Sequence, residues 1–189
     1  MTREQKKIIV VDDNSTILTA CKKIMKPLYE VYPVVSAQKM FELLENITPD
    51  LILLDVDMPD MNGYEAAGRI KKIDAFRKTP IMFLSGRVDP TSEIFGLNMG
   101  ALDYIHKPFV SELLLKRIET HLSLIDSRKI LEERNKSIQE TLAPLNEVIA
   151  SIAEAAESGD PEKIKNCLNK AGSASKDLLA LINGILGTP

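Results

Sequence analysis

Five side chains suited to phosphoryl chemistry stand at or just beyond the ends of short apolar runs: Asp12, Asp13, Asp55, Ser85 and Lys107. Three carboxylates held close together repel one another unless a hard cation compensates them. Mg²⁺ suits such a set because it takes few carboxylate oxygens and keeps water ligands that a phosphoryl group can replace. A lysine and a serine hydroxyl suit the phosphoryl oxygens. The set predicts a carboxylate that accepts a phosphoryl group beside Mg²⁺.

The elements that must position these residues alternate over roughly the first 120 residues. We expect strands over 6–13, 29–35, 50–56, 80–86 and 101–108. We expect helices that begin after Asn14 or Ser15, over 37–46, 63–73 and 92–99, and from Ser111 onward. This alternation predicts a doubly wound parallel sheet, whose functional groups gather outside the carboxyl ends of the strands. The five side chains should therefore meet at one edge of the sheet.

The composition excludes several classes of protein. The 189 residues carry 24 Lys and Arg against 27 Asp and Glu, and this near balance argues against a chain that binds nucleic-acid backbones. No apolar run approaches the about 18–20 residues that cross a bilayer, and the N-terminus lacks a signal-peptide pattern. Cys21 and Cys167 form no metal cluster or disulfide framework, and His106 and His121 are too few for a histidine cluster. We expect a soluble, cytoplasmic protein with no nucleic-acid partner and no membrane insertion.

Four motifs together identify the first part of the chain by resemblance: VVDDN (10–14), LLDVDMPDMNG (53–63), FLSG (83–86) and DYIHKPF (103–109). Any one alone is more often a helix cap or a turn, but their conjunction reverses that balance. Residues 6–122 resemble the receiver domain of bacterial response regulators. The resemblance implies a flavodoxin-like, five-stranded parallel sheet of order 2-1-3-4-5 and a receiver domain over 1–122.

The resemblance also implies roles for the acidic residues. Asp55 would be phosphorylated by a sensor histidine kinase. Asp13 and Asp55 would bind Mg²⁺ directly, Asp12 would bind it through water, and the backbone carbonyl of Asp57 would be a further ligand. In the family the side chain at Asp57 and the one at Arg87 face the phosphoryl group, and here they could pair across the site.

The remaining implied roles concern the last two strands. Ser85 would hydrogen-bond the phosphoryl group, Lys107 would pair with it, and Tyr104 would change rotamer on activation. The bond before Pro108 is usually cis in the family. We expect His106 to be a bystander on the final strand and His121 to sit on a solvated helix face.

Beyond residue 122 the sequence predicts a helical hairpin over 123–189. Apolar residues recur every seven positions at Leu124, Leu131, Ile138, Leu145 and Ile152, which predicts a coiled-coil seam. A second helix should begin with Asp160 as N-cap and Pro161 as its first residue. It carries an apolar face made of Ile164, Leu168, Ala171, Leu178, Leu179, Ile182 and Leu186. Such a hairpin is too small to bury both stripes alone, so we expect a homodimeric four-helix bundle through residues 124–186.

The hairpin resembles the dimerisation and phosphotransfer domain of histidine kinases over about 129–187. QETLAPLN (139–146) matches the first-helix pattern His-Glu-Leu-Arg-Thr-Pro-Leu-Asn, and 178–186 matches the second helix. Gln139 stands at the phosphoacceptor histidine, and its amide cannot carry a phosphoryl group, so we expect a degenerate domain that does not autophosphorylate. A generic coiled-coil dimeriser is the alternative.

These features predict a two-component response regulator rather than an enzyme. At most, the protein would catalyse the phosphorylation and dephosphorylation of its own Asp55. The signal would pass through helix 111–122 into a dimeric helical output module that does not bind DNA. One alternative is a constitutively dimeric adaptor that binds or titrates a histidine kinase. A phosphorelay intermediate is weakened by Gln139, and a transcription factor is disfavoured because no basic recognition helix is present.

Overall fold

The protein is represented by a computed structural model that describes residues 5–87, 89–158 and 161–186. The chain divides into two compact units, Met1–Leu124 and Ile125–Pro189, which we describe separately. Within the described ranges, no helix combines the length and the apolar character needed to cross a membrane.

The first unit is built on five parallel strands. They are β1 (Lys7–Val11), β2 (Glu30–Val34), β3 (Leu51–Asp55), β4 (Ile81–Ser85) and β5 (Asp103–His106). Their order in the sheet is β2-β1-β3-β4-β5, and every neighbouring pair is parallel. The predicted fold class and strand order are confirmed.

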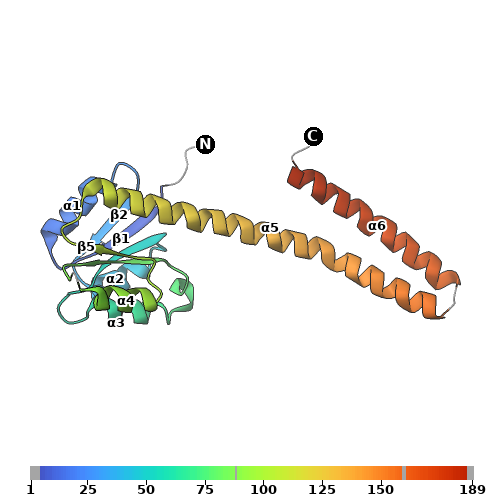
Figure 1. The fold of residues 1–189 in the computed structure, drawn as a ribbon, viewed down its shortest axis with the longest axis horizontal. Coiled ribbons are helices and arrows are strands. Elements are labelled where there is room, and N and C mark those ends of the chain that lie inside the picture. The colour runs from blue at the N-terminus through green and yellow to red at the C-terminus, as the bar shows by residue number, and fades with distance from the viewer. Residues whose placement is uncertain (1–4, 88, 159–160, 187–189) are drawn as a thin grey trace. The chain divides into compact units, whose positions relative to one another are not determined.

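Helices cover both faces of this sheet (Figure 1). They are α1 (Ser15–Met25), α2 (Ala37–Leu44), α3 (Gly63–Ile70), α4 (Pro90–Asn98) and the first part of α5 (Ser111–Ser158), with a short 3-10 helix, η1, at Asp74–Phe76. Side chains of α1 and α5 pack on one face, and side chains of α2 and α3 pack on the other. Because both faces are covered, the central strands are continuous apolar runs. Edge strand β2 accommodates Pro33, since only one of its edges is paired.

Side-chain caps define where the helices begin. Asn14 caps α1 by accepting the Thr16 N–H, which decides between the two predicted caps. Helix α4 begins at Pro90, two residues before the predicted start, because Asp89 accepts the Ser92 N–H and proline suits the first turn. Helix α3 ends at Ile70 rather than at residue 73, where we expected its end, because the chain turns into η1.

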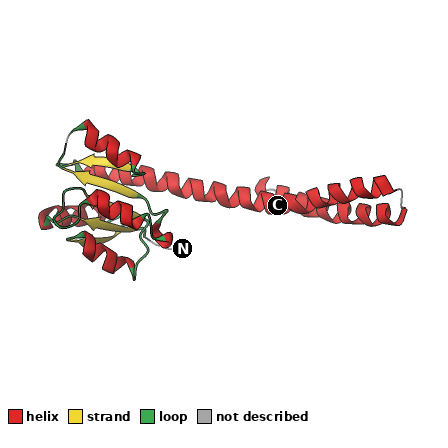
Figure 2. Ribbon diagram, turned by 90° about the horizontal axis from the view of Figure 1, so that it is seen from below, coloured by secondary structure: helices red, strands yellow, loops and turns green. Residues whose placement is uncertain are grey.

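The second unit contains only helix among its described residues (Figure 2). Helix α5 continues to Ser158, and α6 (Pro161–Leu186) begins at the predicted first residue. The predicted cap Asp160 lies outside the described residues, as do the side chains of Pro144, Leu145 and Ile182.

Candidate functional site

The carboxyl ends of β1, β3 and β4 and the residue after β5 converge at one edge of the sheet. Asp12 and Ser85 are fully buried there, and Asp55 is 3% exposed. Asp12, Asp13 and Asp55 each offer a carboxylate oxygen within 4.8 Å of the others, and Asp13 is the exposed member. The topology therefore brings the three acids together as a cluster.

Lys107 lies over two of these acids. Its Nζ is 2.8 Å from Asp55 Oδ1 and 2.5 Å from Asp12 Oδ2. Burial alone would lower the pKa of Lys107, but the two carboxylates outweigh it and the pKa is raised. The Lys107 N–H donates to the Ser85 carbonyl, and the Lys107–Pro108 bond is cis, as the resemblance implied.

The acid cluster has the chemistry of a cation site. Burial raises the pKa of Asp55 and Asp12 adds to the effect, although Lys107 opposes it. Oδ1 of Asp12 accepts the Asn14 N–H, and its buried Oδ2 forms the ion pair with Lys107. One lysine balances only part of the charge of these three clustered carboxylates, so the set fits a hard divalent cation such as Mg²⁺.

Gly63 supports the backbone of Asp55, and the sequence reasoning did not single it out. A Cβ at residue 63 would lie 2.2 Å from the Asp55 carbonyl oxygen, so only glycine fits. The Gly63 N–H donates to the Val56 carbonyl at 2.9 Å, which ties the start of α3 to the end of β3. The Asn-Gly pair at 62–63 could have pointed to this glycine, because Asn62 caps α3 and Gly63 is its first residue.

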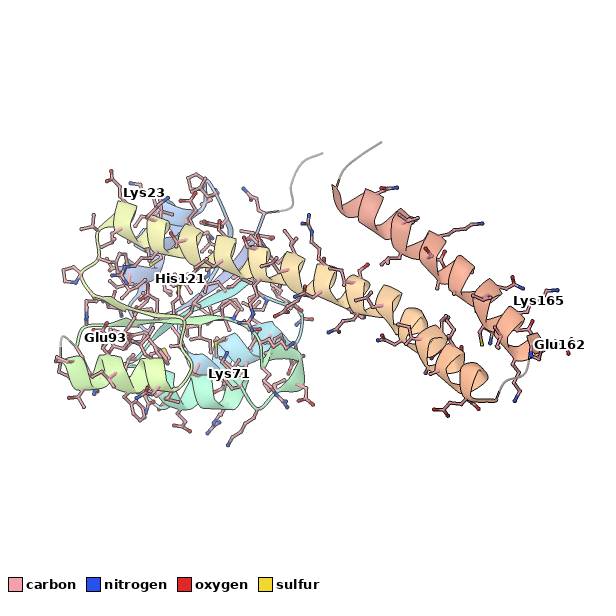
Figure 3. The ribbon with its side chains drawn as sticks, turned by 45° about the vertical axis from the view of Figure 1, so that its right-hand side comes forward. Lys23, Lys71, Glu93, His121, Glu162 and Lys165 are labelled. Carbon is pink, nitrogen blue, oxygen red and sulfur yellow. The ribbon has the colours of Figure 1, made fainter. Side chains whose placement is uncertain are left out.

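Arg87 joins the loops around the site. Its N–H donates to Ser85 Oγ at 3.0 Å, and its guanidinium donates to Asp57 from Nε at 2.8 Å and from Nη2 at 2.5 Å. Arg87 and Asp57 do pair across the site, as the sequence suggested. His106, which we expect to be a bystander to the phosphoryl chemistry, donates from Nδ1 to the Arg87 carbonyl, and its Nε2 lies 3.2 Å from Glu93 of α4 (Glu93 is labelled in Figure 3).

Tyr104 is buried and contacts an aromatic cluster that we did not predict. Its hydroxyl is 3.4 Å from the hydroxyl of Tyr64, which donates to the Ser92 carbonyl of α4 at 3.0 Å. Tyr64 also packs edge-on against Phe83 and Phe95. Burial is the main reason that the pKa of Tyr64 is raised. Tyr64 therefore links Tyr104 to α4. No local pattern signals this, because the two tyrosines are 40 residues apart in the chain.

The prediction that His121 sits on a solvated face of its helix was wrong. Its side chain is only 23% exposed, and Nε2 lies 3.2 Å from Asp103 Oδ2 (Figure 3). Arg117 also binds Asp103, with two bonds of 2.8 and 2.9 Å. Burial alone would raise the pKa of Asp103, but the Tyr104 N–H, Arg117 and His121 outweigh it and the pKa is lowered. This face of α5 packs on β5 through charged groups, which hydropathy does not detect.

Gln139 lies on an exposed position of α5 in the second unit. Leu142, Ala143 and Asn146 of the same motif are also exposed, and the side chains of Thr141, Pro144 and Leu145 lie outside the described set.

Comparisons with known proteins agree with this architecture. The response regulator receiver domain family matches residues 8–119. A Vibrio cholerae protein named "Probable cyclic di-GMP phosphodiesterase" is 33% identical over 163 residues, which cover 82% of this chain and 37% of that protein. Hybrid signal transduction histidine kinase D of Dictyostelium discoideum is 28% identical over 95% of this chain and 12% of its own length. The chain thus spans less than half of either relative.

Solved structures show the same fold. The BeF3-activated receiver domain of DrrB from Thermotoga maritima is 32% identical, with a TM-score of 0.58 over 63% of this chain and 98% of that one. The Vibrio cholerae chemotaxis protein CheY4 is 27% identical, with a TM-score of 0.59 over 61% of this chain and 98% of that one. A parallel sheet with acids and a lysine at its carboxyl edge defines a receiver module. The chain belongs to the response regulator receiver domain family.

Proposed function

We propose that Asp55 accepts a phosphoryl group from a sensor histidine kinase in a Mg²⁺-dependent reaction. The observation that carries this proposal is the cluster of Asp12, Asp13 and Asp55 beneath Lys107. Asp13, Asp55 and the backbone carbonyl of Asp57 would hold the Mg²⁺ ion, with Asp12 acting through water. The bound ion would supply positive charge for the transferring phosphoryl oxygens.

The reaction follows from the groups around Asp55. A carboxylate oxygen of Asp55 attacks phosphorus, the bond from phosphorus to the donor imidazole breaks, and its electron pair returns to the imidazole. Lys107 then pairs with a phosphoryl oxygen in place of Asp55 Oδ1. Ser85 Oγ already accepts the Arg87 N–H, which leaves the hydroxyl proton of Ser85 available to donate to another phosphoryl oxygen. Tyr104 would change rotamer on activation.

Asp55→Asn tests the acceptor, with Asp60→Asn, in the loop that follows β3, as a matched control. Incubation with a small-molecule acyl phosphate and Mg²⁺, followed by intact-mass analysis, should show one added phosphoryl group in wild type and in the control, and none in Asp55→Asn. Without a phosphoryl donor, Mg²⁺ at a hundred times its dissociation constant should stabilise the wild type by about 2.7 kcal/mol. Undiminished labelling of Asp55→Asn would exclude Asp55 as the acceptor.

The second unit would serve as a dimeric output module over 123–189, following a receiver domain over 1–122. Within this unit α5 and α6 border a cavity of about 500 Å³ that is open to solvent and is lined partly by Val148, Ser151 and Ala174. The Cys167 thiol of α6 also donates to the Ser151 carbonyl of α5 at 3.3 Å. Larger apolar side chains remain exposed, namely Leu142, Ile149, Leu168 and Leu179. One hairpin leaves these four side chains exposed, which supports a homodimer through 124–186 like the kinase dimerisation domain, with Gln139 in place of histidine.

Light scattering after size-exclusion chromatography tests this module, with and without Mg²⁺ and beryllofluoride. Ile149→Glu should abolish the dimer, whereas Lys165→Glu at an exposed position of α6 should leave it intact (Lys165 is labelled in Figure 3). A dimer that forms only with beryllofluoride, and not in Asp55→Asn, would make phosphorylation the switch for assembly. A monomer under every condition would exclude the dimeric module.

A constitutive dimer would favour the second candidate, an adaptor that binds or titrates a histidine kinase through this unit. The isolated unit should then dimerise and bind the kinase in the absence of the receiver. The activity named for the Vibrio cholerae relative is not assigned to this chain, since the two share only 37% of that protein's length.

A further inference from the structure

One stretch of α5 is exposed around the whole circumference of the helix. Every residue from 127 to 137 is exposed, which amounts to about three helical turns at 3.6 residues per turn. Helix stability in proteins comes mostly from packing, and within its own chain this stretch buries no side chain. The continuous helix of this stretch therefore indicates a binding partner.

The sequence of the stretch specifies what kind of partner fits. With Leu124, Leu131 and Ile138 at the d positions of a heptad repeat, Arg128, Asn135 and Leu142 occupy the a positions. Leu124 is 61% exposed, Leu131 is 60% exposed and Leu142 is 40% exposed. A seam with a seven-residue period matches another helix that has the same period, and a second copy of this chain supplies one.

The polar residues in the seam are compatible with such pairing. Arg128 Nε donates to Glu132 Oε1 at 2.9 Å, so its charged end is held at the flanking e position while its methylenes can cover the seam. Arg134 at position g would face Gln139 at position e of the other copy, so like charges are not opposed there. Asn135 at position a can donate and accept a hydrogen bond with its own counterpart.

We propose that residues 124–142 form a parallel, in-register, two-stranded coiled coil with a second copy of this chain, with Asn135 paired to Asn135 across the seam. An antiparallel pair would place each Asn135 amide against apolar residues without a partner, at the cost of an unsatisfied polar group. A single asparagine at an a position selects register and a two-stranded state. This inference rests on the proposed homodimer and adds its orientation and alignment.

Cysteine cross-linking of the full chain tests the geometry. Cys167 is replaced by Ser, while Cys21 stays because it is buried, which raises the pKa of its thiol to about 12. Leu131→Cys and Ile138→Cys place a thiol at d positions, and Glu133→Cys and Lys136→Cys place one on the outer face of the same helix. Under mild oxidation at low protein concentration, the two seam variants should form disulfide dimers at least ten times faster than the two outer ones.

The outcomes separate this inference from the proposed dimer. If light scattering shows a dimer but the seam variants link no faster than the outer ones, the coiled coil is overturned and the dimer stands. A monomer with and without beryllofluoride overturns both. Asn135→Leu should convert the dimer into a mixture with higher oligomers, and an unchanged dimer mass in that variant would overturn the role of Asn135.

Discussion

The two units of this chain differ in how far they bury their large apolar side chains. In the sheet unit, Leu51 to Leu54 of β3 are fully buried between two layers of helices. In the helical unit, leucine and isoleucine side chains such as Ile149 and Leu168 remain mostly exposed, and small residues such as Ala174 face the cavity between α5 and α6. The sheet unit completes its core within one chain, whereas the helical unit needs a second surface to complete its own.

Two glycines give the largest expected contrast. Gly63→Ala should destabilise the sheet unit by on the order of 4 kcal/mol, because its Cβ would overlap the Asp55 carbonyl. Gly172→Ala in α6 should stabilise by about 0.5–1 kcal/mol, since among described atoms nothing outside its own helix lies within 4 Å of that Cβ. Urea denaturation measures both. A destabilising Gly172→Ala would mean that another surface packs closely on that face.

Two leucines sharpen the comparison further. Leu53→Ala should cost about 3 kcal/mol at any protein concentration, because it empties a fully buried position in β3. Leu131→Ala should leave the stability of the monomer unchanged but weaken the dimer, so the effect should grow with concentration. Thermal unfolding over a hundredfold range of concentration distinguishes the two. A concentration-independent loss in Leu131→Ala would show that this side chain is buried within one chain.

The charge at Asp55 gives a smaller, pH-dependent effect. Burial raises the pKa of Asp55 above 3.8, so ionising this carboxyl costs folding free energy as pH rises through the range between the unfolded and folded pKa values. Without Mg²⁺, Asp55→Asn should therefore be more stable than wild type at pH 7, by on the order of 1 kcal/mol, and the difference should vanish near pH 3. Denaturation at several pH values tests this. A wild type that is the more stable protein at neutral pH would contradict it.

The hydroxyl of Tyr64 gives the smallest expected effect. Tyr64→Phe removes one hydrogen bond to Ser92 and the contact with Tyr104, at a cost of about 1 kcal/mol. Tyr32→Phe is the matched control, since the hydroxyl of Tyr32 binds only exposed Glu30 in β2 and its loss should be close to neutral. Equal losses in the two variants would show that the Tyr64 hydroxyl contributes no more than a surface group.

The sheet could be predicted because its signals are local and agree with one another. Continuous apolar runs such as Leu51 to Leu54 indicate buried strands, and parallel topology then places Asp12, Asp55 and Ser85 at one edge. Helix ends were less predictable, since α4 begins two residues early through a cap that a strict apolar pattern does not show. His121 was misjudged because the group that draws it inward, Asp103, is 18 residues away and charged.

In the helical unit, the helices could be predicted from the sequence but the contacts between them could not. A seven-residue period shows that Leu124 and Leu131 share a face, and Pro161 marks where the second helix begins. The pattern does not show which residues of α5 and α6 face each other, because Ala174 and Ser151 are too small or too polar to stand out. The structure shows which side chains lie between the two helices and which face outward: Val148 and Ala174 are buried, and Ile149 is exposed.

The ion pair of Arg87 with Asp57 also sets the charge balance at the carboxyl edge of the sheet. Asp12, Asp13, Asp55 and Asp57 contribute four negative charges, and Lys107 and Arg87 contribute two positive ones, which leaves a net charge of two minus. One divalent cation would neutralise that remainder, so these six groups and the cation together would present no net charge to an anionic phosphoryl donor. Without Arg87 the same cation would leave one negative charge facing the donor, and like charges slow encounter most at low ionic strength.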